Sequence, residues 1–144
     1  MAIVALVAIL AAGLFTGAAL YITFVEHPAR LSCGPAVALA EFRPSYARAT
    51  VMQVSLVVAG AGAGAARWAL GGAVGWLLGA VSLAAVVPFT LLIVLPTNHR
   101  LLDATLDAAS PDTVMLLRRW GRLHALRGVL GLIAFATFVV LLVA

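Results

Sequence analysis

The sequence contains no lysine and only five acidic residues, and just 10% of its 144 residues are charged. Soluble domains are about 25% charged and about 45 to 50% apolar, whereas 65% of this chain is hydrophobic. A separate soluble domain is excluded, because the chain has too few polar residues to cover so much apolar surface. The single cysteine, Cys33, excludes an intramolecular disulfide and a CxxC metal motif. The composition therefore predicts a membrane protein.

Four long apolar runs follow one another along the chain, separated by short polar stretches. A membrane-spanning helix uses roughly 20 residues, so we expect a single domain over residues 1–144. Its predicted fold is an all-α membrane protein, a bundle of four transmembrane helices. Pro44 suits a first helical turn, and Pro88 predicts a kink in the third helix. The expected helices cover about residues 3–27, 44–66, 73–96 and 112–143.

Two polar stretches, residues 28–43 and 97–111, are expected to connect the helices on one side of the membrane. That side holds all the arginines except Arg67, together with all five acidic residues. Arginine-rich connections stay in the cytoplasm, so we expect multi-pass insertion in the inner (cytoplasmic) membrane with both termini on the extracytoplasmic side. Membrane topology thus explains the excess of arginine over acidic residues, and no nucleic-acid partner is expected.

Polar residues recur on one face of the expected fourth helix, where Trp120, His124 and Arg127 are spaced by four and then three positions. Side chains at this spacing share a helix face. Tyr46 and Gln53 form a similar stripe on the second helix. Polar groups inside a bilayer must find partners, so we expect these stripes to face each other and to form a polar pocket toward the cytoplasmic side.

Two residues of the fourth helix are the strongest candidates for chemistry. An arginine within a membrane costs about 2.5 to 3.5 kcal/mol to insert, which makes Arg127 a functional-site candidate. The alternative is an Arg127 that reaches the interface or pairs with Glu26 or Asp103. His124 carries an imidazole that suits proton transfer near neutral pH. The structural alternative for the whole stripe is that it only joins the helices.

Four segments of the chain resemble one family. They are GLFTGAALYITFVEHPAR (13–30), FRPSYARATVMQ (42–53), PTNHRLLD (96–103) and RRWGRLHALRGVLGL (118–132). Together they resemble the anthrone oxygenases, which are small four-helix membrane proteins. The most specific part is an N-x-x-L segment followed by W-x-x-x-H-x-x-R. The resemblance implies that functional positions are Asn98, Trp120, His124, Arg127 and His27 beside Pro28.

The resemblance implies oxidation of polyketide anthrones to anthraquinones by O2, with no known organic cofactor. Such chemistry needs a base, a donor to the developing oxyanion and an apolar slot for a flat molecule. The expected roles are a base (His124 or His27), oxyanion donors (Arg127 and Asn98) and substrate-binding walls (Trp120, Tyr46 and Gln53). The expected partners are membrane lipid, a hydrophobic small molecule and O2. Homo-oligomerisation is left open by the sequence.

Two other classes of function fit the same residues. The first is a site for a transition metal or haem, whose ligands would be His27, His99, His124 and Glu26. No HExxH or CxxC motif supports it. The second is a non-enzymatic membrane subunit or small-molecule binder, in which the polar stripes hold the bundle together.

The arginine distribution predicts the orientation of the chain. Reporter fusions after Ala144 and within Gly71-Gly72 should report the extracytoplasmic side, because the positive-inside rule keeps the arginine-rich side in the cytoplasm. A reporter between residues 104 and 109 should report the cytoplasm. A cytoplasmic reading for the fusion after Ala144 would contradict this orientation.

Overall fold

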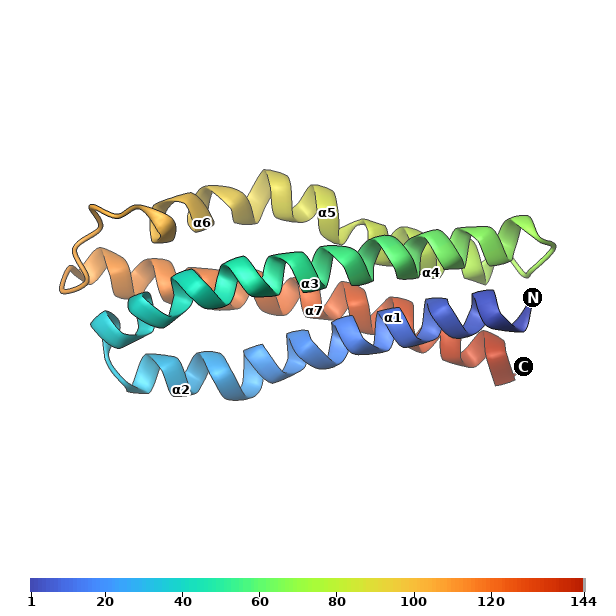
Figure 1. Cartoon of the computed structure of the whole chain (residues 1–144), viewed down its shortest axis with the longest axis horizontal. Helices are drawn as coiled ribbons and strands as arrows, with labels where there is room; N and C mark the ends of the chain where they lie inside the picture. Colours follow the sequence, from blue (N-terminus) through green and yellow to red (C-terminus); the bar gives the residue numbers. More distant parts are fainter. Residues whose placement is uncertain (144) are drawn as a thin grey trace.

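The computed structural model describes residues 1–143, and these residues form helices and short connections without any strand. Four helices are long and apolar enough to cross a membrane, namely Ala2–Ser32, Pro35–Ala69, Gly75–Leu102 and Pro111–Val143. They run side by side in one elongated bundle with both termini at the same end (Figure 1). The four apolar helices indicate a multi-pass membrane protein.

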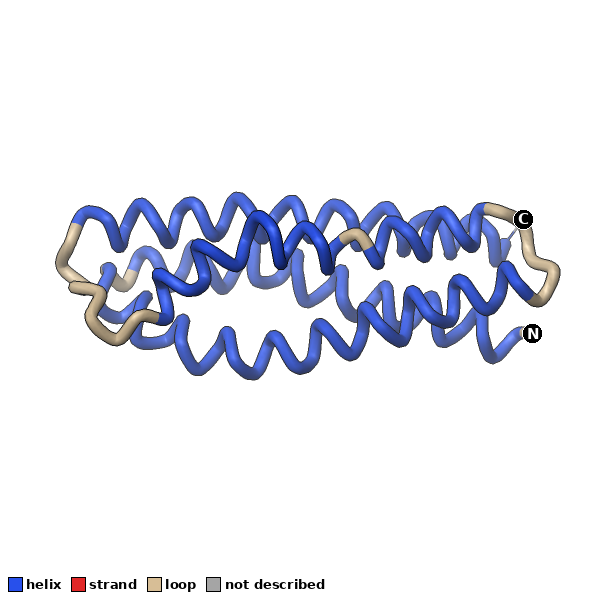
Figure 2. The backbone as a smooth tube through the Cα atoms, turned by 90° about the horizontal axis from the view of Figure 1, so that it is seen from above, coloured by secondary structure: helices blue, strands red, loops and turns tan. Residues whose placement is uncertain are grey.

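Two of the four long helices are composed of several elements. The first contains α1 (Ala2–Tyr21), a π-helical segment η1 (Ile22–Glu26) and α2 (His27–Ser32). The second is α3 (Pro35–Ala69), and the fourth is α7 (Pro111–Val143). The third contains α4 (Gly75–Ala84), α5 (Val86–Phe89), the π-helical segment η2 (Thr90–Val94) and α6 (Leu95–Leu102). Both α1 and α4 pack against α3 and α7, and Figure 2 shows the connections at the two ends.

The turn between the first two long helices is much shorter than expected. The prediction of an interfacial connection over residues 28–43 is wrong, because the chain is helical on both sides of Cys33 and Gly34. Gly34 has a positive φ of 87°, which glycine adopts at little cost. Pro35 then takes the first turn of α3, a position that suits proline. Pro44, the expected start, lies inside this helix.

Proline also shapes the third long helix. The expected kink at Pro88 is present as a break in the helix at Ala85, between the end of α4 and the start of α5. A proline ring clashes with the carbonyl group four residues earlier, which explains why the break precedes it. Beyond η2 the helix continues to Leu102. The second polar connection is therefore 103–110, shorter than the predicted 97–111.

Asp103 fixes the start of this connection. Its carboxylate accepts hydrogen bonds from the backbone N–H and the hydroxyl group of Thr105, both at 2.8 Å. These bonds, the backbone one first, hold the pKa of Asp103 below its usual range. Nη2 of Arg43 donates to the Asp103 carbonyl oxygen at 2.7 Å. The connection is thereby tied to α3.

The two π-helical segments widen their helices just ahead of proline residues. In η1, the N–H of His27 donates to the carbonyl of Ile22, shortly before Pro28. In η2 the same wide turn closes on Thr90, shortly before Pro96. Such insertions enlarge the helix locally and are frequent at functional sites.

The half of the bundle that holds the chain termini is packed closely through glycine. A Cβ atom on Gly79 would lie 2.5 Å from the ring of Phe138, and one on Gly64 would lie 2.7 Å from the same ring. Trp76 stacks on Phe138 with ring centroids 5.3 Å apart. Because glycine lets helix backbones approach closely, the large rings fit between the helices in this half.

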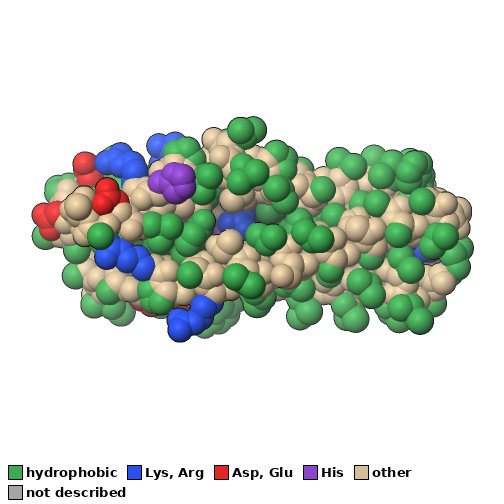
Figure 3. All heavy atoms as spheres, turned by 45° about the horizontal axis from the view of Figure 1, so that its top comes forward, with side chains coloured by type: hydrophobic (Ala, Val, Ile, Leu, Met, Phe, Trp, Pro, Cys, Tyr) green, Lys and Arg blue, Asp and Glu red, His purple; other side chains and the backbone are tan. Residues whose placement is uncertain are grey.

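Charged side chains gather at the opposite end of the bundle. Figure 3 shows most basic and acidic groups there, beside a largely hydrophobic remainder. This distribution follows the sequence, in which Arg67 is the one arginine near the other end. The charged end contains the Cys33-Gly34 turn and the 103–110 connection.

The close glycine contacts can be tested at Gly60. Gly60→Val should destabilise the protein, because a Cβ atom there lies 2.7 Å from Leu83 and 3.3 Å from Ala11. Overpacking of this kind costs about 1 to 3 kcal/mol. Gly62→Val is the matched control, since nothing lies within 4 Å of its Cβ position. Thermal unfolding in detergent measures both, and equal stabilities would contradict the close contact.

Candidate functional site

A cavity of about 310 Å³ lies in the half of the bundle nearer the charged end. The two π-helical segments flank it, together with α2, α3, α5, the start of α6 and the middle of α7. Most of its lining is apolar. The polar or aromatic side chains among its lining residues are Glu26, Arg30, Phe42, Ser45, Tyr46, Thr50, Gln53, Thr90, Trp120, His124 and Arg127.

Arg127 and Gln53 join the second and fourth long helices inside the cavity. Nη2 of Arg127 donates to Oε1 of Gln53 at 2.7 Å. Among the described residues no carboxylate forms a salt bridge with Arg127, so the expected alternatives Glu26 and Asp103 are not its partners. The guanidinium is therefore held by a neutral amide, and no carboxylate among the described residues pairs with it beside the cavity.

His124 lies one turn from Arg127 on α7 and lines the same cavity. Its side chain is 2% exposed. Neither ring nitrogen makes a hydrogen bond of good geometry within the described chain, and the backbone of Ala19 in α1 lies close beside the ring. The ring stacks on Trp120, with centroids 4.8 Å apart and planes tilted by 16°. On the other faces of α7, Leu126 and Val129 point outward. The helix thus presents the orientation expected from its sequence.

His27 lies on the far side of Trp120 and does not line the cavity. Its ring centroid is 5.2 Å from that of Trp120, and its Nε2 is 3.0 Å from the carbonyl oxygen of Leu117. A Cβ atom on Gly121 would lie 2.6 Å from the His27 ring, so glycine provides the space for it. The structure places His27 as a contact between α2 and α7, beside an outer groove.

Asn98 is buried but also lies outside the cavity lining. Its Nδ2 donates to the hydroxyl oxygen of Tyr46 at 3.1 Å. Tyr46 stacks on Phe42 with centroids 5.7 Å apart, and Phe42 meets Trp120 edge-on at 5.1 Å. Three aromatic rings therefore form one wall of the cavity, and Asn98 orients the outermost ring.

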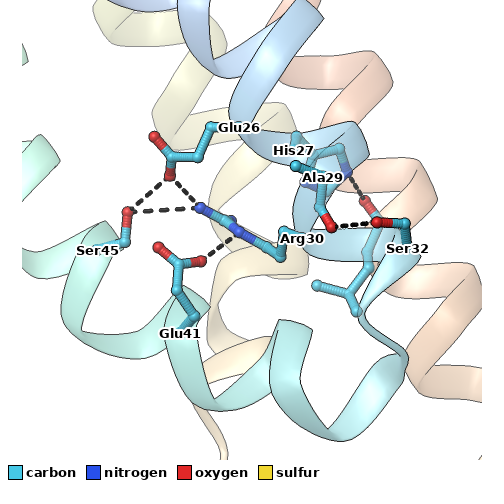
Figure 4. A network of polar contacts seen from close by, with 8 residues as sticks. Glu26, His27, Ala29, Arg30, Ser32, Glu41 and Ser45 are labelled. Atoms are coloured by element: carbon cyan, nitrogen blue, oxygen red, sulfur yellow. Dashed lines mark hydrogen bonds and ion pairs between the residues drawn. The ribbon is translucent and has the colours of Figure 1, made fainter.

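Arg30 forms an ion cluster at the charged end of the cavity (Figure 4). Its guanidinium pairs with Glu26 of η1 and with Glu41 of α3. The Ser45 hydroxyl donates to Glu26 at 3.2 Å. Arg30 is 6% exposed, and its guanidinium carbon lies 5.8 Å from the ring centroid of Phe42. This cluster was not predicted from the sequence, although the spacing of Glu26 and Arg30 by four residues is a recognisable signal for a helical ion pair.

The residues predicted as metal ligands do not lie together in one site. His99 is exposed on α6, whereas His124 lines the cavity and His27 does not. Within residues 1–143, no group of three or more His, Cys, Asp or Glu side chains is arranged to hold a metal ion. Glu26 instead pairs with Arg30.

Comparison with known proteins identifies one family. The family model described as anthrone oxygenase matches residues 42–137, about two-thirds of the chain. The matched region includes Asn98, Trp120, His124 and Arg127, whereas His27 lies outside it. No match to the chain is found among curated proteins or among solved structures.

The Gln53–Arg127 hydrogen bond can be tested by a double-mutant cycle. Gln53→Leu should lower the free energy of unfolding by about 1 to 3 kcal/mol, because it leaves the guanidinium without its partner inside the bundle. Arg127→Leu in the same chain should recover part of the loss, since it removes the unpaired charge. Ser55→Ala, at an exposed position of α3, is the control. A Gln53→Leu protein as stable as this control would show that the bond contributes nothing.

Proposed function

Because the chain belongs to the anthrone oxygenase family, we propose that it is an inner-membrane oxygenase for a flat, hydrophobic phenolic or polyketide-type substrate. The observation that carries the proposal is that a buried imidazole and an arginine without a carboxylate partner line one aromatic-walled cavity. These are His124 and Arg127. A base and a cation in a mostly apolar cavity suit the removal of a proton from an acidic carbon.

His124 is the proposed base. Its ring lines the cavity, and the Ala19 backbone lies close beside it, so we propose that one ring nitrogen donates to the Ala19 carbonyl and the other accepts the substrate's proton. His27 was the other candidate, but its Nε2 bonds to the Leu117 carbonyl and its ring faces an outer groove. We therefore assign His27 a supporting role, in which it holds one side of Trp120.

Arg127 is the proposed oxyanion donor. When a proton leaves the carbon opposite a ring carbonyl, negative charge develops on that oxygen, and a fixed cation stabilises it most in surroundings of low dielectric constant. Gln53 orients the guanidinium through the 2.7 Å hydrogen bond. Asn98 was predicted to be a second donor, but it bonds to the Tyr46 hydroxyl outside the cavity lining. Its proposed role is to orient that ring.

The proposed reaction converts a ring CH2 group and O2 into a ring C=O group and water. His124 removes one proton, and the resulting carbanion transfers electrons to O2 as a carbon–oxygen bond forms. The imidazolium returns its proton to the peroxide. Loss of the second C–H proton then breaks the O–O bond, which releases hydroxide that is protonated to water. Because the carbanion itself reduces O2, we propose that no bound cofactor takes part.

The proposed orientation places the arginine-rich end in the cytoplasm and both termini outside, as the positive-inside rule requires. The cavity then lies in the cytoplasmic half of the bundle, and the parts of α3, α5 and η2 that line it carry no charge. Lipid is a good solvent for aromatic compounds and O2, so both reactants can reach the protein through the bilayer. We infer that membrane lipid, O2 and one hydrophobic small molecule are its partners.

Substitutions at three positions separate chemistry from architecture. His124→Gln should reduce turnover of anthrone by about 10²- to 10⁴-fold, because it keeps a polar side chain of similar size but loses the base. Arg127→Lys should also reduce turnover, since it keeps the charge but loses the planar fork. His99→Gln, at an exposed position, is the control. The measurement is anthraquinone formed per folded molecule in liposomes.

Other outcomes of this experiment favour the rival functions. Unchanged specific activity in both variants would remove His124 and Arg127 from the reaction. Tight binding of anthrone without turnover in the unchanged protein would favour a small-molecule binder. Stoichiometric iron or copper in active protein, with activity lost on chelation, would contradict the cofactor-free reaction.

A further inference from the structure

The cavity is closed toward the charged end of the bundle. The Arg30 cluster fills this end, because its guanidinium pairs with carboxylates from two helices and is 6% exposed. Phe42 and Trp120 lie against it, with ring centroids 5.8 and 5.9 Å from the guanidinium carbon. A molecule coming from the water at that end would have to break two ion pairs and displace two packed rings.

The cavity is open on one side of the bundle instead. Four of its lining residues are exposed, and they face each other across the boundary between α3 and the α5–η2 segment: Thr50, Val54, Val87 and Leu91. Val54 is 50% exposed and Leu91 is 56% exposed. Figure 3 looks onto this side, and blue atoms of a basic group are visible in a hollow between hydrophobic side chains near the middle of the molecule.

The walls of this opening belong to uncharged stretches of sequence. No charged residue occurs in α3 between Arg48 and Arg67, and none occurs in the following chain before Arg100. Val54 and Leu91 lie within these stretches, so an inserted bundle holds them at the depth of the lipid chains. The opening therefore meets hydrocarbon rather than water.

We propose that the ligand of this cavity passes sideways between α3 and the α5–η2 segment, directly from the bilayer. This inference rests on the proposed function, because it takes an apolar, flat aromatic molecule as the ligand. Pro88 and the wide turn of η2 hold the third helix in the shape that leaves the gap. We call the opening between Thr50, Val54, Val87 and Leu91 the mouth of the cavity. After the ligand's rings have passed the mouth, its oxygen can contact the polar groups at the inner wall, Gln53 and Arg127.

A matched pair of double variants tests the route. Val54→Phe with Leu91→Phe adds two rings at the mouth, whereas Val51→Phe with Leu92→Phe adds the same two rings at positions that are 70% and 77% exposed and do not line the cavity. Both pairs are made in a Trp68→Phe, Trp76→Phe background, which leaves Trp120 at the cavity as the only tryptophan. The probe is 9,10-anthraquinone in liposomes, detected by stopped-flow quenching of Trp120 fluorescence.

The association rate should fall by about tenfold or more in the mouth pair, because binding then requires a conformational change, and should stay at the parental value in the control pair. Glu41→Gln, which weakens the ion cluster at the charged end, should leave the rate unchanged. A parental rate in the mouth pair, or faster association in Glu41→Gln, would overturn the proposal. Val87→Phe alone provides the same test if the mouth pair does not fold.

The failure of this route and the failure of the proposed oxygenase reaction give different results. If the mouth pair slows quenching although the parental protein forms no anthraquinone from anthrone, the lateral route stands and the reaction does not. If the mouth pair binds the probe and turns over anthrone at parental rates, the reaction stands and the lateral route does not.

Discussion

The distance between the helices is the constraint on which the rest of this structure depends. Near the termini, Gly64 and Gly79 let the backbones approach so closely that Phe138 fills the remaining space. All six prolines lie outside this closely packed half, and two of them follow π-helical turns that border the cavity. Small side chains thus bring the helices together at one end, and proline-induced distortions keep them apart at the other. The cavity is the space that this difference produces.

The polar groups of the bundle divide into two sets. One set finds partners within the protein, as Arg30 does with Glu26 of its own helix and with Glu41 of α3, because a polar group in an apolar bundle cannot turn to water. The other set has buried atoms without a hydrogen bond of good geometry in the described chain, among them both nitrogens of His124 at the cavity and Oγ1 of Thr16 away from it. Buried groups without partners are uncommon in folded proteins and call for an explanation. At the cavity, the proposed ligand would supply such partners through its oxygen atoms.

Helical spacing predicted the inward face of α7 from the sequence, because a period of 3.6 residues places Trp120, His124 and Arg127 together whatever their neighbours are. The helix boundaries predicted from proline positions were less reliable. Pro35 and Pro44 both suit a first turn, and only the positive φ of Gly34 decides between them. Ending the first helix before Pro28 and starting the second at Pro44 assigned Arg30 and Glu41 to a connection. The exclusion of His27 and Asn98 from the cavity lining depended on distances between helices, which no local pattern contains.

The order of the helices has a consequence for how the protein is made. Each half of the chain is a hairpin: one is closed by Cys33-Gly34, and the other by the 103–110 connection. Helices that insert into a membrane separately can associate afterwards. Gln53 and Tyr46 belong to the first hairpin, whereas Arg127 and Asn98 belong to the second. The hydrogen bonds Arg127–Gln53 and Asn98–Tyr46 therefore exist only when the two hairpins are in contact, and neither hairpin alone contains the complete site.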